Sequence, residues 1–231
     1  TTIGAFAFYN CSKLTWDLVI PNEMTEIENG TFYGCSGLKS LVIPDSVEKI
    51  GGWAFSGCSG LKSVTMPISS VYYITNAVND AEKQNSFYGC NGVETIKYTR
   101  GNGKVFSKIF SEGIPNVNSL PHYARETLKT VIFDEGVTEL GNSILYGCSK
   151  VTKVQLPTTL TKINVRAFSG CESLTDITIP ENVTTIEGSA FSNCSSISDM
   201  LLPESVTTIG AFAFYNCSKL TWDLVIPNEM T

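Results

Sequence analysis

The sequence is poor in charge and in histidine. Charged residues occupy 16% of its 231 positions, and His122 is the only histidine, whereas ordinary soluble domains carry about 25% charged residues. The net charge is −6 and no run of Lys or Arg occurs, which argues against nucleic acid as a partner. Any Ser–His–Asp or Cys–His catalytic scheme needs His122, and no carboxylate pair stands out. We therefore predict that the chain is not an enzyme.

Long apolar runs are missing as well. No stretch approaches the roughly 18 apolar residues of a membrane-spanning helix, so we expect no membrane span in this sequence. The opening Thr-Thr-Ile lacks the basic and apolar leader of a signal peptide. We interpret the chain as a piece of a longer protein.

What the sequence does contain is an internal repeat. Its cysteines fall at positions 11, 35, 58, 90, 148, 171, 194 and 217, and the last four are each 23 residues apart. Alignment on the cysteines gives one unit, which reads Ile-x-x-x-Ala-Phe-x-x-Cys-x-x-Leu-x-x-Ile-x-Ile-Pro from Ile163 to Pro180. Self-similarity at such a period predicts a repeat architecture.

The repeat divides into a strand and a turn. Apolar and polar residues alternate in Leu-x-x-Ile-x-Ile-Pro, which is strand periodicity, and Pro ends the strand because it cannot donate to a ladder. The Ala-Phe-x-x-Cys part favours a tight or 3₁₀-like turn. The residue before the cysteine suits left-handed backbone geometry at Gly34, Gly57, Gly170, Asn193 and Asn216. One repeat cannot fold alone, so we predict a single β-rich repeat solenoid over residues 1–231, a stack of about nine short parallel strands.

The pattern resembles the BspA-type leucine-rich repeat, found in surface proteins of anaerobic gut and oral bacteria and of some parasitic protists. Residues 1–67 and 138–231 carry the resemblance, with degenerate copies between them. It implies a curved, right-handed leucine-rich-repeat stack and an extracellular or cell-surface location. In that family, where function is known, it is adhesion to host or neighbouring-cell proteins. The resemblance brings no catalytic residues and no cofactor.

The eight cysteines each stand three residues after a core position, usually Phe. We favour buried thiols, since Cys behaves as a small hydrophobe. Disulfides between adjacent repeats are the alternative, although parallel Cβ vectors make the required torsion awkward. A metal site is disfavoured, because ligands 23 residues apart along a rod cannot gather around one ion.

The template breaks in two places. Cysteine spacings of 32 and 58 place insertions at residues 68–86 and 99–127. Insertions in solenoids map to loops and often carry binding residues; the alternative is that they are solvated connections of no consequence. Tyr and Arg are enriched among binding hot spots, so the candidate protein-binding residues here are Tyr72, Tyr73, Arg100, Tyr123 and Arg125. Counting back from Leu128 puts His122 and Arg125 at core positions, which suit neither, so we expect a register shift with both on a loop.

The outward side of the strands is a second candidate surface. It is flat, weakly charged and rich in Ser and Thr, with positions Ser40, Val42, Ser63, Thr65, Lys153, Gln155, Asp176, Thr178, Asp199 and Leu201. A flat face suits broad protein contact and argues against a deep small-molecule pocket. The copies at 14–20 and 220–226 are one residue longer than the others, so we predict a bulge that pushes Trp16 and Trp222 outward.

The two ends of the chain are identical. Residues 1–25 and 207–231 match at every position, at an offset of 206. We predict that the parent protein is a tandem array of a 206-residue unit, and that isolated units associate end to end, because their terminal repeats lack polar caps.

Two functions fit these features. One is a protein-binding, adhesin-like scaffold at the cell surface, whose partner is a host matrix protein, a neighbouring cell surface or its own neighbouring repeats. The alternative is a structural spacer unit of a long array with no specific ligand. We expect no cofactor, no metal and no nucleic acid in either case.

Overall fold

A computed structural model describes residues 2–15, 17–68, 85–101 and 120–221. These residues divide into two compact units, on either side of the Leu128–Lys129 bond. The first unit contains β1 (Leu18–Val19), β2 (Glu26–Ile27), β3 (Ser40–Val42), β4 (Lys49–Ile50), β5 (Ser63–Pro67), β6 (Thr95–Thr99) and α1 (Leu120–Ala124). The second contains β7 (Thr130–Phe133), β8 (Lys153–Gln155), β9 (Lys162–Ile163), β10 (Thr185–Ile186) and β11 (Thr208–Ile209).

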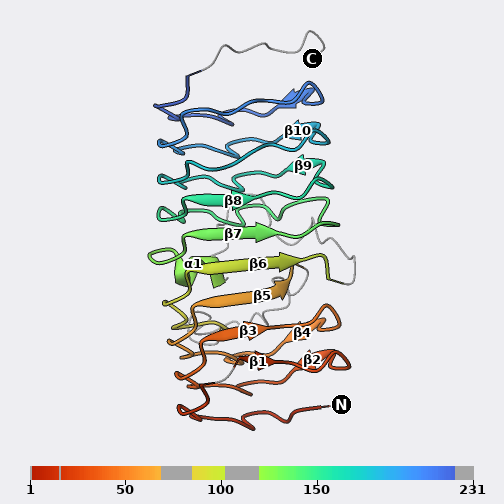
Figure 1. Ribbon diagram of the computed structural model, residues 1–231, viewed down its shortest axis with the longest axis vertical. Coiled ribbons are helices and arrows are strands. Elements are labelled where there is room, and N and C mark those ends of the chain that lie inside the picture. The colour runs from red at the N-terminus through yellow and green to blue at the C-terminus, as the bar shows by residue number, and fades with distance from the viewer. Residues whose placement is uncertain (1, 16, 69–84, 102–119, 222–231) are drawn as a thin grey trace. The chain divides into compact units, whose positions relative to one another are not determined.

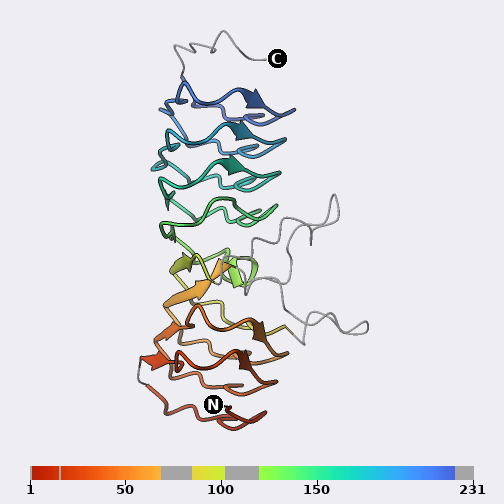
Figure 2. The ribbon, with the colours of Figure 1, turned by 90° about the vertical axis from the view of Figure 1, so that its right-hand side faces the viewer.

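Every strand pairs in parallel with its equivalent in a neighbouring repeat. In the first unit β1, β3, β5 and β6 form one ladder, in the register Leu18↔Leu41, Leu41↔Val64 and Val64↔Ile96 (Figure 1). β2 and β4 form a narrower ladder on another side of the same coils (Figure 2). In the second unit β7 pairs with β8, and β9, β10 and β11 form a ladder. The predicted β-rich leucine-rich-repeat solenoid with short parallel strands is confirmed.

The core consists of columns of like side chains. Phe32, Phe55 and Phe87 are fully buried and stack on one another with centroid distances of 5.4 Å. Phe168 and Phe191 do the same in the second unit, at 5.1 Å. Because each coil places the same residue above its predecessor, a repeat buries its apolar side only against its neighbours.

Most of the described turns contain two residues with left-handed backbone, whereas the turn at 85–90 has only Gly89 in this conformation. The second is the predicted one before the cysteine, and its φ is +72° at Gly34, +80° at Gly170 and +62° at Asn193. The first lies four residues earlier and was not predicted, since among the described turns it is Gly at Gly30 but another residue elsewhere: Phe6, Trp53, Ser143, Arg166, Ser189 and Phe212. The left-handed residue turns its N–H toward the next coil, as where Arg166 N–H donates to the Gly188 carbonyl at 3.1 Å. That bond offsets a conformation that L-residues rarely adopt.

The described edges of the first predicted insertion belong to the packed core. Ile68, Asn85 and Ser86 are buried, and Ser86 Oγ donates to the Gly51 carbonyl at 2.7 Å. The rest of the predicted insertion at 68–86 lies outside the described residues, so its bounds stay a prediction. Ser86 fills the place that Ala54 holds in the preceding repeat, directly before a core Phe.

The predicted loop for His122 is wrong. His122 lies in α1, and Arg125 follows in the turn. The expected register shift does occur, because Ala124 is fully buried while Arg125 is exposed. Residues three and four apart lie on the same side of a helix, so α1 buries Leu120, Pro121 and Ala124 together, and Arg125 follows on the exposed side.

Candidate interaction surface

The cysteines form buried columns beside the Phe columns. All eight, each of which the structure describes, are thiols, and six of them are buried while Cys11 and Cys217 are half-buried. A thiol donates to the carbonyl of the core residue one repeat earlier, as from Cys58 to Phe32 at 3.2 Å and from Cys194 to Phe168 at 3.1 Å. The predicted burial is confirmed for these six side chains.

Burial keeps these thiols protonated. It raises the pKa of Cys58 to about 12 and the pKa of Cys90 and Cys171 well above their ordinary value. The nucleophilic and metal-binding form of Cys is the thiolate, so these columns have a packing role. Among the residues described, no group of three or more His, Cys, Asp or Glu side chains is placed to hold a metal ion.

Tyrosines recur at one turn position in several coils of the first unit: Tyr9, Tyr33 and Tyr88 stand two residues before a cysteine, and Tyr123 stands two before Arg125. Tyr9 and Tyr88 are exposed, Tyr33 and Tyr123 are half-buried, and the coil between Tyr33 and Tyr88 has the buried Ser56 at this place. We call Tyr9, Tyr33, Tyr88 and Tyr123 the tyrosine edge. Tyr9 stacks on Tyr33 with a centroid distance of 5.1 Å, and Tyr88 meets Tyr123 edge to face at 5.8 Å. Tyr9 is 51% exposed and Tyr88 42%. These rings offer apolar faces and hydroxyl groups together, which suits a protein interface.

The helix α1 holds the predicted residue Tyr123 in this edge. The hydroxyl oxygen of Thr127 lies 3.0 and 2.8 Å from the carbonyl oxygens of Asn91 and Val93, so its single O–H donates to one of them and ties the segment after α1 to the preceding repeat. His122 packs edge-on against Tyr123 at 5.6 Å. The predicted candidate Tyr123 therefore belongs to an ordered aromatic group.

The two predicted arginines do not lie together. Arg125 is exposed in the turn after α1 and makes a 3.7 Å ion pair with Glu126. Arg100 is exposed after Thr99, the last residue of β6. The α1 segment is fixed near Asn91 and Val93, before β6 begins, so the length of a five-residue strand, roughly 17 Å, separates the two sites.

Four other candidates, Tyr72, Tyr73, Trp16 and Trp222, lie outside the described residues. Their assignment to a binding surface stays a prediction. The register Leu18↔Leu41 does place the extra residue of the first copy before β1, as the predicted bulge requires.

The predicted outward strand face is exposed only in part: in the first unit Val42 is exposed, whereas Ser40, Ser63 and Thr65 are half-buried. In the second unit the predicted positions Thr178, Asp199 and Leu201 lie outside the strands. Lys153, Gln155, Asp176, Thr178, Asp199 and Leu201 are exposed in the second unit. In the first unit Val19 and Val42 are cross-strand partners, 66% and 39% exposed, so they form a small apolar patch. Lys153 and Asp176 form an exposed ion pair at 2.7 Å. Such pairs contribute little stability in water.

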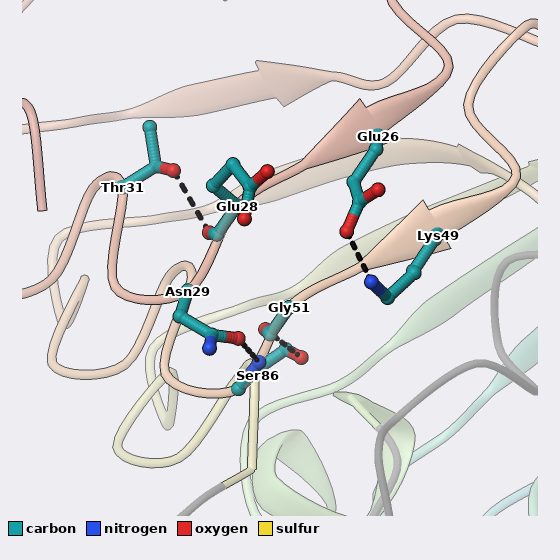
Figure 3. Close-up of polar contacts among 8 residues, drawn as sticks. Glu26, Glu28, Asn29, Thr31, Lys49, Gly51 and Ser86 are labelled. Atoms are coloured by element: carbon teal, nitrogen blue, oxygen red, sulfur yellow. Dashed lines mark hydrogen bonds and ion pairs between the residues drawn. The ribbon is translucent and has the colours of Figure 1, made fainter. Parts of the chain in front are cut away.

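A polar group closes the turns between β2 and β4 (Figure 3). Glu26 forms an ion pair with Lys49, and this contact raises the pKa of Lys49. The side-chain oxygen of Asn29 accepts from the N–H of Gly52 at 2.9 Å. These contacts join the coil of β2 to the coil of β4.

Sequence reasoning missed Tyr9, Tyr33 and Tyr88. They lie in regular repeats, outside the insertions and the strand face to which binding was assigned from the sequence. A column-by-column alignment gives the signal, because the place two before the cysteine holds Tyr at 9, 33, 88, 146 and 215. Where that place holds Ser, as at Ser56, Ser169 and Ser192, the side chain is buried.

The chain is similar to known repeat proteins. A family model described as the BspA type leucine rich repeat region matches residues 1–119 and 118–231, in six copies. A leucine-rich repeat protein from T. pallidum is 21% identical with a TM-score of 0.51, over 89% of this chain and 78% of that one. One from Bacteroides ovatus is 25% identical with a TM-score of 0.46, over 94% and 74%. A leucine rich cell surface protein from Faecalibacterium prausnitzii is 20% identical with a TM-score of 0.44, over 87% and 76%.

No curated protein matches the chain. Within the part of the chain that is described, no helix has the length and apolar character needed to cross a membrane.

Proposed function

From the premise that this chain belongs to the BspA-type leucine-rich repeat family, we propose that it is a cell-surface scaffold that binds another protein. The partner class is a host matrix protein or a protein of a neighbouring cell. The tyrosine edge of the first unit is the contact surface that we favour. The outward strand face and the insertion residues Tyr72, Tyr73 and Arg100 are further candidates.

The edge-to-face pair of Tyr88 and Tyr123 is the observation that carries this proposal. Tyr88 is 42% exposed, and Tyr123 is held against it by α1. A tyrosine with a fixed ring loses little side-chain entropy when it is covered, and it offers both an apolar surface and a hydroxyl group. Buried Tyr and Arg side chains dominate the binding energy of many protein interfaces, and Arg125 lies two residues beyond Tyr123.

The regularity of the coils supports a scaffold. Phe, Cys and backbone contacts repeat from one coil to the next, so an exposed side chain can change without changing the core beneath it. The cysteine columns are protonated and buried, and the polar group of Figure 3 is satisfied internally. These features support binding in preference to catalysis.

The test is binding of the whole chain to a panel of immobilised matrix proteins, such as fibronectin, laminin and collagen, by biolayer interferometry. We expect Tyr88→Ala and Tyr123→Ala each to weaken binding about tenfold or more, which corresponds to about 1.4 kcal/mol. Tyr146→Ala is the matched control, since Tyr146 holds the same repeat place in the second unit and is 41% exposed. Equal losses in all three variants, or binding unchanged in both edge variants, would contradict the tyrosine edge as the contact surface.

A structural spacer is the second candidate, and the identity of residues 1–25 and 207–231 favours it. Duplication of a long unit lengthens a stalk without requiring any ligand. A spacer predicts no saturable binding to any member of the panel, so the same experiment separates the two functions.

A further inference from the structure

Two identical segments of the chain are covered on opposite sides. Residues 1–25 pack against the repeat at 26–48, which follows them, whereas residues 207–221 pack against the repeat at 184–206, which precedes them. Residues 207–231 repeat residues 1–25 at every position. The two copies therefore show which coil this 25-residue sequence contacts when a repeat follows it and which coil it contacts when a repeat precedes it.

On the following side, the contacts of residues 1–25 are specific. Three N–H groups donate to the next coil: Phe6 to Asn29 at 3.0 Å, Phe8 to Thr31 at 2.8 Å and Asn10 to Tyr33 at 2.7 Å. The ring of Phe8 stacks on Phe32 at 5.2 Å, and that of Tyr9 on Tyr33 at 5.1 Å. The thiol of Cys35 donates to the Phe8 carbonyl at 3.1 Å.

The receiving coil is shaped for these side chains. A Cβ atom added to Gly30 would lie 2.2 Å from Cε1 of Phe6, and one added to Gly34 would lie 2.0 Å from Oδ1 of Asn10. Gly30 holds the first left-handed place of its turn, where other coils have Trp53, Ser143, Arg166 or Ser189. The coil at 26–48 therefore accepts the Phe6 ring where those coils carry a side chain of their own.

On the preceding side, the same sequence makes a different set of contacts. Phe191 N–H donates to the Ala213 carbonyl at 2.8 Å, and the Phe191 ring stacks on Phe214 at 5.4 Å. The outward residues of the segment remain open: Phe212 is 70% exposed and Tyr215 59%, against 45% for Phe6 and 51% for Tyr9. Residues 207–221 thus carry, side chain for side chain, the surface with which residues 1–15 bind the coil at 26–48.

We propose that residues 207–221 of one copy bind the coil at 26–48 of a second copy, in the place of that copy's residues 1–25. Phe212, Phe214, Tyr215 and Asn216 then take the positions of Phe6, Phe8, Tyr9 and Asn10. Every contact of this interface already exists once within the chain, so it needs no new geometry. Exchange of an identical element between protomers is a low-cost route to assembly. Here the exchanged element is the 25-residue segment that recurs 206 positions later in the chain.

Two truncated chains of identical composition test this. Residues 26–231 lack the N-terminal copy, so the coil at 26–48 is uncovered while the segment that fits it is present. Residues 1–206 contain the same residues in circularly permuted order, with that coil covered and the second copy absent. By light scattering at about 100 µM we expect the mass of 26–231 to rise at least twofold over that of a monomer, while 1–206 remains monomeric. Phe214→Asp in the 26–231 chain should restore the monomer mass.

A cooperative thermal melt checks that each chain folds. Monomeric 26–231 with an intact melt, or equal association of both chains, overturns the proposal. Light scattering of variants of the full chain is an independent test that needs no truncation. Phe8→Asp loosens residues 1–25 from their coil and should promote association, whereas Phe214→Asp and the double variant should remain monomeric. Equal behaviour of Phe8→Asp and Phe214→Asp, which change the same residue in the same local sequence, also overturns it.

Discussion

The Sγ atom of Cys58 lies 3.2 Å from the carbonyl oxygen of Phe32, in the preceding coil. The same relationship joins Cys90 to Phe55 at 3.1 Å and Cys217 to Phe191 at 3.1 Å. The Phe32 carbonyl also accepts from the N–H of Cys35 at 3.2 Å, and the thiol is a small apolar group that can still donate to its second lone pair. This explains why one residue type recurs at this place in the coil.

Thiol titration tests the state of these cysteines. We expect eight reactive groups with Ellman's reagent in denaturant without reductant, and a much slower reaction in the native protein, because six of the side chains are buried. The fast native phase should come from Cys11 and Cys217, which are half-buried, and the double variant Cys11→Ala/Cys217→Ala should remove it. Fewer than eight groups in denaturant would instead show disulfides between repeats.

The pH dependence of stability follows from the same burial. The pKa of Cys58 rises to about 12 in the folded chain from an ordinary value near 9.0, through burial. Above about pH 9 the unfolded chain releases this proton while the folded chain retains it, so the free energy of unfolding falls as pH rises from 9 toward 12. Below pH 9 the stabilisation is fully present. Each such thiol contributes a slope of about 1.4 kcal/mol per pH unit.

Urea denaturation at a series of pH values between 8 and 11 measures this slope. Cys58→Ala should make the decline shallower, because one raised pKa is removed. Leu61→Ala, also fully buried, is the control: it should lower stability at every pH and leave the slope unchanged. The same slope in the parent chain and in Cys58→Ala would show that this thiol does not titrate differently on unfolding.

The sequence was sufficient to predict the columns of the fold. The period of 23 places each core Phe and Cys above its equivalent, and the alternation around Ile177 and Ile179 fixes which strand residues face inward. Residues obeying the repeat are buried or exposed as this pattern requires. Features that depend on contacts between residues far apart in the sequence could not be predicted in this way. The helix at Leu120–Ala124 appears where the template fails, and its five residues are too few to show helical periodicity.

The tyrosine edge could be predicted from the sequence only in part. Tyr123 was predicted as a candidate because it lies in an insertion. Its partner Tyr88 lies in a regular repeat and was not predicted. Their contact depends on α1, which Thr127 fixes to the coil containing Asn91. The first left-handed place was missed for a related reason. Ser189 and Arg166 carry no local signal of positive φ, and their N–H groups donate to the next coil, at Ala211 and Gly188.

Substitutions at the left-handed positions should change stability in opposite directions. Ser189→Gly should raise the free energy of unfolding by about 0.5–1 kcal/mol, because φ is +57° there and Gly adopts it without strain. Gly170→Ala should lower it by about 1–2 kcal/mol, since φ is +80° and the new Cβ would lie 3.2 Å from Cα of Gly147. Gly147→Ala separates the two causes: φ is +70° but nothing lies within 4 Å of its Cβ, so it should cost less. Chemical denaturation measures all three.

The Phe column should contribute to stability in proportion to stacking and burial. Phe55 is fully buried between Phe32 and Phe87, each 5.4 Å away, so Phe55→Ala opens a cavity and removes two ring contacts. We expect a loss of about 3–5 kcal/mol, and a smaller loss for Phe55→Leu, which keeps most of the volume. Phe6→Ala is the matched control, because Phe6 is 45% exposed and should cost less than about 1 kcal/mol. In a stack of coupled coils the damage spreads only to neighbours, so hydrogen exchange in Phe55→Ala should rise around residues 32 and 87 and stay unchanged around residue 191. Uniform deprotection of the whole chain would show instead that the coils unfold as one cooperative body.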